Sequence, residues 1–230
     1  MDQHLENKVC LITGATNGIG EESAKELNKM GAEIIFIARN EEKGNKLKEQ
    51  LLKDSGREAT MIIADLSSQD QVKKAAEQFL SLDKPLDILL NNAGIMNRER
   101  NETVDGLEEV FSVNHLAYFT FTLMLSEKLK QTEGSRVINV ASGAHQFVKN
   151  MNFDDLQSKE NYKPMQVYGQ SKLANILFTK ALSTKLSDFG VTVNCLHPGF
   201  VSTGIGSNNN KTLWSFLMFL ANPIARYAVK

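Results

Sequence analysis

The stretch Thr13-Gly14-Ala15-Thr16-Asn17-Gly18-Ile19-Gly20 directly follows the apolar run KVCLIT and leads into a segment with helical patterning. Strand, glycine-rich turn and helix stand in the order that a pyrophosphate-binding site needs. Glycines let the backbone approach the phosphates closely, and free N–H groups at the helix N-terminus stabilise their charge. The spacing G-x-x-x-G-x-G differs from the usual dinucleotide pattern G-x-G-x-x-G. A plain tight turn would use the same glycines, but the position in a first βα unit favours the phosphate site.

The remainder of the chain repeats this alternation of short apolar runs and longer amphipathic segments. The runs are KVCLIT, EIIFIA, ATMIIA, LDILLN, RVINVA and VTVNCL, and the expected helices cover Gly18–Met30, a segment through Leu52, Gln69–Ser81, segments through Lys130, and Tyr168–Leu186. Six strands separated by helices predict an α/β fold of the Rossmann type, a doubly wound parallel sheet with strand order 3-2-1-4-5-6. Because no repeat or linker interrupts the 230 residues, we expect one dinucleotide-binding domain over residues 1–230.

Composition excludes several classes of protein. The formal net charge of -1, without a basic block, argues against nucleic-acid binding. Cys10 and Cys195 both lie in apolar runs, so we expect buried core residues and no disulfide. The start MDQHLENK lacks a signal-peptide pattern, which predicts an intracellular, cytoplasmic location. The apolar run Leu213–Ala221 is shorter than the ~20 residues that span a bilayer, although it suits peripheral contact with a membrane surface.

The end of the second apolar run bears on which cofactor would bind. It reads Ala38-Arg39-Asn40, without the carboxylate that would bond the ribose hydroxyls of NAD. Arg39 can pair with a 2′-phosphate in bidentate fashion, so we expect NADP (NADPH). Glu41 and Glu42 follow closely, and an arginine at a strand end is also a common surface residue. Further cofactor contacts are expected from Asp65 and Leu66 after the third run and from Asn92, Ala93 and Gly94 after the fourth, although each of these would also suit a cap or a turn.

Reacting groups are indicated by Tyr168-Gly169-Gln170-Ser171-Lys172, because residues four apart share one helix face. A nearby cation, together with an oxidised nicotinamide ring, would lower the pKa of a tyrosine from about 10 and favour proton exchange. The same spacing is common on ordinary amphipathic helices. The position of Ser142 favours a catalytic site over an ordinary helix. Ser142 follows the fifth run, at the carboxyl edge where ligands bind in open α/β sheets.

Together, TGATNGIG, NNAG, Asn114, Ser142, YGQSK and HPG resemble the short-chain dehydrogenase/reductase family in order and spacing. The segment SKLANILFTKAL is similar to the subset containing retinol dehydrogenases and WW-domain oxidoreductase relatives. The resemblance runs from about Lys8 to Thr203 and implies a catalytic tetrad. In it, Tyr168 would be the general acid/base, Ser142 would orient the carbonyl, Lys172 would bind the nicotinamide ribose and tune Tyr168, and Asn114 would hold a water. It also implies a homodimer through the helices bearing Asn114 and Tyr168, and nicotinamide contacts from Pro198, Gly199 and Thr203.

The two histidines that invite a metal interpretation, His145 and His197, lack further ligands at metal-like spacing, so no metal is expected. After HPG, residues 197–230 carry many apolar side chains, which predict a cover over a lipophilic carbonyl or alcohol of retinoid, steroid or xenobiotic type. Packing on the protein's own core or on another subunit is the other interpretation. The residues concerned are Phe200, Trp214, Phe216, Leu217, Phe219 and Leu220.

The resembling family normally continues through another helix and a seventh strand, whereas this sequence stops at Lys230. That ending would leave VTVNCL as an apolar sheet edge. We therefore predict an NADP(H)-dependent oxidoreductase. The alternatives are a cofactor-binding regulatory or scaffold protein with chemistry impaired by the short C-terminus, and a nucleotide-sugar epimerase or dehydratase, for which too few residues remain.

Overall fold

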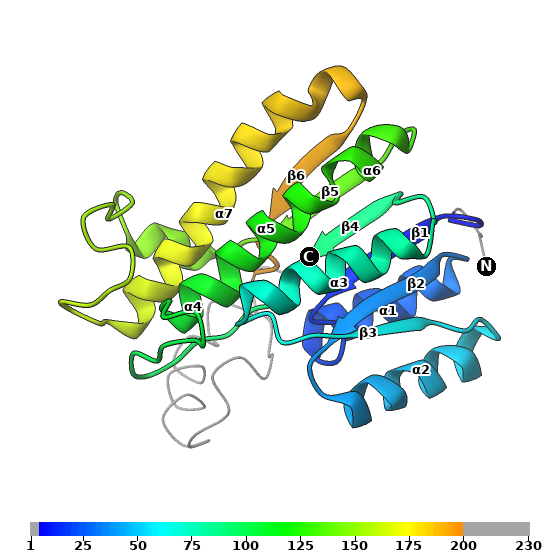
Figure 1. Ribbon diagram of the computed structural model, residues 1–230, viewed down its shortest axis with the longest axis horizontal. Coiled ribbons are helices and arrows are strands. Elements are labelled where there is room, and N and C mark those ends of the chain that lie inside the picture. Colours follow the sequence, from blue (N-terminus) through cyan, green and yellow to red (C-terminus); the bar gives the residue numbers. More distant parts are fainter. Residues whose placement is uncertain (1–4, 200–230) are drawn as a thin grey trace.

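The computed structural model describes residues 5–199, which form one parallel six-stranded sheet between helices (Figure 1). The strand order is β3-β2-β1-β4-β5-β6, so the predicted fold class and order are confirmed. All five strand pairs are parallel. The strands are β1 (Val9–Thr13), β2 (Glu33–Ala38), β3 (Thr60–Ile63), β4 (Ile88–Asn91), β5 (Arg136–Val140) and β6 (Thr192–Leu196).

The helices connect successive strands and cover both faces of the sheet. They are α1 (Gly18–Lys29), α2 (Glu41–Ser55), α3 (Gln69–Ser81), α4 (Glu109–Phe111), the π-helix η1 (Ser112–Leu116), α5 (Ala117–Met124), α6 (Ser126–Gln131), the 3-10 helix η2 (Gly143–Phe147), α7 (Pro164–Leu186) and the 3-10 helix η3 (Ser187–Phe189). The predicted bounds differ mainly at α7, which begins four residues before Tyr168 because Pro164 suits a first helical turn. None of the helices within residues 5–199 is long and apolar enough to cross a bilayer.

Two hydrophobic cores lie on opposite faces of the sheet. Alternate residues of β1 point to opposite faces, so Leu11 joins the core formed with α3, α5 and α7, whereas Cys10 and Ile12 join the core formed with α1 and α2. All three side chains have no exposed area. The apolar character of β1 on both faces follows from this double coverage.

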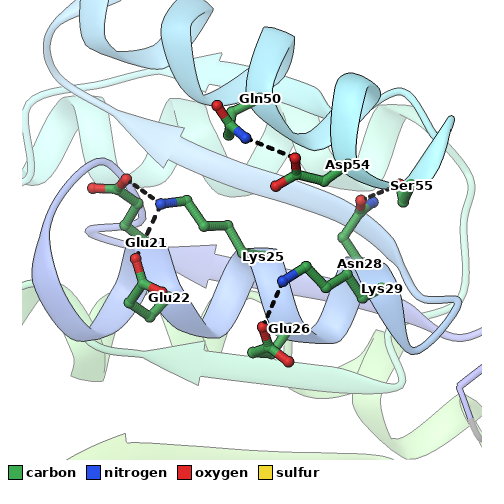
Figure 2. A network of polar contacts seen from close by, with 9 residues as sticks. All are labelled: Glu21, Glu22, Lys25, Glu26, Asn28, Lys29, Gln50, Asp54 and Ser55. Carbon is green, nitrogen blue, oxygen red and sulfur yellow. Dashed lines mark hydrogen bonds and ion pairs between the residues drawn. The ribbon is translucent and has the colours of Figure 1, made fainter. Parts of the chain in front are cut away.

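The helices α1 and α2 are joined by a polar contact within the second core region (Figure 2). The Ser55 hydroxyl, at the end of α2, bonds the side chain of the fully buried Asn28 on α1. Ion pairs such as Lys29 to Glu26 lie along the exposed side of α1. The contact joins the C-terminal ends of α1 and α2.

The strand β6 lies at the edge of the sheet and is only partly covered. Val193 is buried, but Cys195 and Leu196 are exposed. The prediction that Cys195 is a core residue is therefore wrong, because the described helices cover β6 only near Val193. Cys10 is buried as predicted, and both described cysteines are free thiols.

Candidate active site

The glycine-rich turn packs directly on the segment after β4. Gly14 has a φ of +68°, and a Cβ there would lie 2.7 Å from the Cα of Ala93. A Cβ on Gly20 would overlap the carbonyl oxygen of Gly14, so only glycine lets α1 start this close to the turn. These contacts within the protein require glycine at both positions, while the predicted approach of the backbone to phosphates stays a prediction.

The N-terminus of α1 differs from those of the next two helices. The side chain of Asn17, its N-cap residue, makes no capping hydrogen bond, whereas Asn40 caps α2 and Ser68 caps α3 through bonds to backbone N–H groups. The first N–H groups of a helix have no partner within it, so those of Gly18, Ile19 and Gly20 are available for an anion. The turn fits the phosphates of a dinucleotide.

The NNAG segment is held to β1 by Thr13. The Thr13 hydroxyl accepts hydrogen bonds from the backbone N–H groups of Asn92 (2.9 Å) and Ala93 (3.1 Å). The Asn92 amide donates in return to the carbonyl oxygens of Thr13 and Gly14. Tyr118 of α5 completes the anchor, because its hydroxyl donates to the Ala93 carbonyl at 2.6 Å. Sequence reasoning missed Thr13 and Tyr118 as site residues, since neither stands out from an ordinary strand or helix pattern.

At the other side of the turn, Arg39 and Asp65 follow the neighbouring strands β2 and β3. The Arg39 guanidinium is exposed and lies 3.9 Å from the Asp65 carboxylate. Asp65 also accepts a bond from the N–H of Ser67 (2.9 Å), which shapes the turn after β3, and Leu66 is buried. The structure thus brings Arg39 and Asp65 together at the carboxyl edge of the sheet.

Tyr168, Ser142 and Lys172 converge at the end of β5. A hydrogen bond from Ser142 lowers the pKa of Tyr168, but burial raises it more, so the Tyr168 pKa lies above its ordinary value. Lys172 is 2% exposed and donates from Nζ to the carbonyl of Val140 at 3.0 Å. Burial lowers its pKa to about 8. The expected lowering of the Tyr168 pKa by Lys172 is therefore not seen in the protein alone, because burial is the larger effect.

The contact between η2 and α7 depends on Gly169. A Cβ at this position would lie 2.7 Å from the carbonyl oxygen of Ala144. Glycine therefore lets the first turns of α7 rest on η2, which begins directly after Ser142. Gly169 thus lets the element that follows Ser142 pack against the turn of α7 that carries Tyr168. The tyrosine-lysine spacing does not reveal this role.

Asn114 lies in the π-helix η1 and is fully buried. Its Oδ1 accepts from the N–H of Ile95 (2.8 Å), and its Nδ2 donates to the Ile95 carbonyl and to the Ser171 hydroxyl, both at 3.0 Å. A Cβ on Gly94 would lie 3.5 Å from Lys172 Nζ and 3.6 Å from Asn114 Oδ1, which places Asn114 next to the lysine. The amide binds protein partners here, and its predicted water stays a prediction.

The other residues considered in the sequence analysis follow β6, adjoin Ser142 or lie outside the described part of the chain. Pro198 and Gly199 follow β6 and are exposed. His145 Nδ1 is bonded to the carbonyl of Ser142 (2.7 Å), and His197 is exposed. Within residues 5–199, no group of three or more His, Cys, Asp or Glu side chains is placed to hold a metal ion. Outside the described residues lie Thr203 and the apolar set Phe200, Trp214, Phe216, Leu217, Phe219 and Leu220.

Comparison with known proteins identifies the family. Residues 8–214 match the short chain dehydrogenase family. The chain is 40% identical to retinol dehydrogenase 12 of Mus musculus over 206 residues, 89% of this chain and 65% of that protein. Retinol dehydrogenase 11 of Homo sapiens is 38% identical over 216 residues, 94% of this chain and 68% of that protein. The chain thus spans about two thirds of the length of these curated relatives.

A solved structure with a bound nucleotide is also similar. The RhlG/NADP active-site complex of Pseudomonas aeruginosa has a TM-score of 0.72 and 27% sequence identity, over 88% of this chain and 76% of that one. The fold therefore agrees with these comparisons, and the resemblance to the family drawn from the motifs is confirmed. This chain belongs to the short-chain dehydrogenase/reductase family of oxidoreductases and is similar to its retinol dehydrogenases.

Proposed function

We propose that the protein is an NADP(H)-dependent oxidoreductase that transfers a hydride between the nicotinamide and a lipophilic carbonyl or alcohol. The observation that carries the proposal is the convergence of Asn114, Ser142, Tyr168 and Lys172 at the carboxyl edge of the sheet, on the same edge as the uncapped start of α1. The cofactor supplies the hydride chemistry, and the protein supplies position and electrostatics.

Each member of the tetrad has a role that its contacts support. The Ser142 hydroxyl binds the carbonyl oxygen of the substrate, next to the phenol of Tyr168, which donates the proton in the direction of reduction. The Lys172 ammonium donates one hydrogen bond to the Val140 carbonyl. Its remaining N–H donors bind the nicotinamide ribose. Asn114 holds the backbone at Ile95 in place beside Gly94.

The preference for NADP rests on Arg39. Its ion pair with Asp65 is long and exposed, and such pairs contribute little, so the guanidinium can turn to a 2′-phosphate. No carboxylate stands at the end of β2 to repel that phosphate. The solved complex of RhlG with NADP supports the same cofactor in a related fold. Asp65 then lies beside the adenosine.

The substrate class rests on the relatives and on composition. Retinol, for which the two curated relatives described above are named, is a lipophilic alcohol. The segment after His197 is rich in aromatic and aliphatic residues. We assign it to the cover of the substrate, with peripheral membrane contact, and we place the protein in a reducing intracellular compartment, in which its two free cysteines persist.

A substrate panel with both cofactors tests the proposal. Lipophilic aldehydes and ketones, including retinal, should be turned over faster than small polar carbonyls, and kcat/KM should be about 10- to 100-fold higher with NADPH than with NADH. A charge-assisted bond from Arg39 to the 2′-phosphate is expected to contribute about 1.5–3 kcal/mol, which gives this ratio. The measurement is the steady-state oxidation of each reduced cofactor.

The control for this panel is Arg39→Gln, which removes the cation and keeps a polar side chain. Its kcat/KM with NADPH should approach the value with NADH, which should change little. Equal use of both cofactors by the unaltered protein would contradict the assignment of Arg39, and equal or better turnover of polar carbonyls would contradict the substrate class.

We also propose a homodimer through α5 and α7. Phe119 and Leu123 of α5 and Leu177 of α7 are large apolar side chains that are 41%, 43% and 46% exposed. The two helices lie side by side, and the Phe119 and Phe178 rings are 5.3 Å apart between centroids (Figure 1). Burial of such side chains favours association. Light scattering should give twice the mass of the chain, and Leu177→Lys should give the monomer; a monomeric mass for the unaltered protein would contradict the proposal.

A further inference from the structure

A polar stripe runs along the buried side of α7 beyond the two reacting residues. Tyr168, Ser171, Lys172 and Asn175 are spaced so that they share one face of the helix. Ser171 and Asn175 have no exposed area, and both contact η1. A buried amide costs free energy unless its hydrogen bonds are made, so Asn175 needs an explanation where a leucine would pack without that cost.

The orientation of the Asn175 amide is determined by two partners on η1. Its Nδ2 donates to the backbone carbonyl of Asn114 at 2.8 Å, and its Oδ1 lies 3.0 Å from Nδ1 of His115. Burial lowers the pKa of His115, which favours the neutral ring. Because the Asn175 Oδ1 can only accept, the tautomer with the proton on Nδ1 is the one that fits this contact. The His115 ring is itself surrounded by those of Phe111, Phe119 and Phe178. The amide therefore cannot turn over without losing both bonds.

Asn114 of η1 is bonded to α7 twice, through its side chain and through its backbone. The side chain of Asn114 bonds Ser171 at 3.0 Å, and the backbone carbonyl of Asn114 accepts from Asn175 one turn further along α7. Ser171 stands between Tyr168 and Lys172 in the sequence, and its hydroxyl also donates to the Tyr168 carbonyl at 2.7 Å. Because both bonds involve Asn114, they fix the position of α7 along its axis and its rotation about that axis relative to η1.

We propose that Asn175, with its amide held by His115, is a positioning residue that sets the register of α7 against η1 and so places Tyr168 and Lys172 relative to Asn114. The inference rests on the proposed function and adds a residue outside the tetrad. The side-chain hydrogen bonds of Asn175 go to Asn114 and His115 and not to either reacting side chain, so Asn175 acts through the backbone of Asn114. A displacement of the reacting groups by about 1 Å can lower a rate by 10²-fold, so loss of this bond should affect turnover more than binding.

The test compares Asn175→Leu with Thr179→Val. Thr179 lies one turn further along the same buried face, accepts a bond from Asn139 (2.9 Å) and does not bond η1, so its substitution also leaves a buried polar group unpaired. We expect kcat of carbonyl reduction to fall about 10- to 100-fold in Asn175→Leu, with KM and the NADPH dissociation constant within about threefold of the unaltered protein. In Thr179→Val, kcat should stay within about twofold at a comparable loss of thermal stability.

The readouts are steady-state kinetics, NADPH fluorescence titration and thermal unfolding of each full-length variant. Equal kcat in the two variants, per folded molecule, would overturn the proposal. If Asn175→Leu does not fold, His115→Phe decides, because phenylalanine suits the surrounding rings and removes only the donor: a kcat lowered several-fold supports the role, and an unchanged kcat overturns it. An unaltered protein that binds NADPH but shows no turnover would overturn the proposed function as well, which is a different result from equal variants.

Discussion

Replacement of Tyr168 by phenylalanine is expected to lower kcat of carbonyl reduction by about 10²- to 10⁴-fold while NADPH still binds. Phenylalanine keeps the ring beside Lys172, whose Nζ lies 5.6 Å from the ring centroid, and removes only the proton donor and the bond to Ser142. General acid catalysis contributes about 10²- to 10⁴-fold. Among the described residues, the one other hydroxyl that we assign to the substrate carbonyl is that of Ser142. Carbonyl-dependent NADPH oxidation and NADPH fluorescence titration measure the two quantities.

Tyr162→Phe is the matched control for this change. The Tyr162 hydroxyl donates to the Asn97 carbonyl at 3.2 Å, in the loops beyond β4 and β5, and has no part in the tetrad. We expect its kcat to stay within about threefold of that of the unaltered protein. A Tyr168→Phe variant as active as this control would refute the acid/base role. Cofactor binding without turnover in the unaltered protein would instead favour the scaffold alternative.

Lys172→Met is expected to have opposite effects on activity and stability. The rate of carbonyl reduction should fall about 10²- to 10³-fold, because the donor to the nicotinamide ribose and the cation beside the developing charge are both lost. The protein without cofactor should become more stable, since a buried cation is removed. Burial lowers the Lys172 pKa from 10.5 to about 8, a shift that corresponds to about 3 kcal/mol against the charged form.

The sign of the pH dependence follows from the direction of this shift. Between pH 8 and the ordinary pKa of lysine, the unfolded chain binds more protons than the folded one, so the free energy of unfolding rises with pH across that window. Below pH 8 the whole penalty applies, and the gain in stability of Lys172→Met should be largest there. Conversely, kcat/KM for NADPH should fall as the pH rises through about 8 in the unaltered protein only.

Thermal unfolding of the protein without cofactor at pH 7 and pH 10 measures the stability difference. Lys180→Met serves as the control, because Lys180 is an exposed residue of the same helix and should change neither stability nor rate. A Lys172→Met variant that unfolds at a lower temperature than the unaltered protein at pH 7 would show that the ammonium stabilises the fold and would contradict the argument from burial.

Local patterns were enough to predict the sheet, and they pointed to several residues that the structure brings together in the candidate site. The apolar runs predicted the strands and their order because each run is covered on both faces, as Leu11 and Ile12 are. The same rule failed at Cys195, since an apolar run at the sheet edge has the same sequence pattern as a central one. Tyr168 and Lys172 were found because their spacing fits one helix face.

The residues that sequence reasoning missed act through tertiary hydrogen bonds. Thr13 binds two N–H groups of a segment nearly eighty positions away, and Asn175 bonds a carbonyl sixty-one positions away. The π-helix η1 was expected as ordinary helix, because a widened turn depends on which backbone groups pair and not on a residue pattern. Such roles become visible only once the strands and helices are placed together.

The strands stand in a different order in the sheet than along the chain. This difference affects how early each strand pairing can form as the molecule folds. In β1, Cys10 pairs with Ile34 of β2 on one side and with Ile88 of β4 on the other. During synthesis the first pairing can form early, whereas the second waits for the chain to return past β3, and distant parallel pairings of this kind are slow. The pairings of the half that would carry Arg39 can therefore form before those of the half with α7. A ligand that spans both halves would favour only the finished molecule, so it would act as a late stabiliser of the native state and not as a folding nucleus.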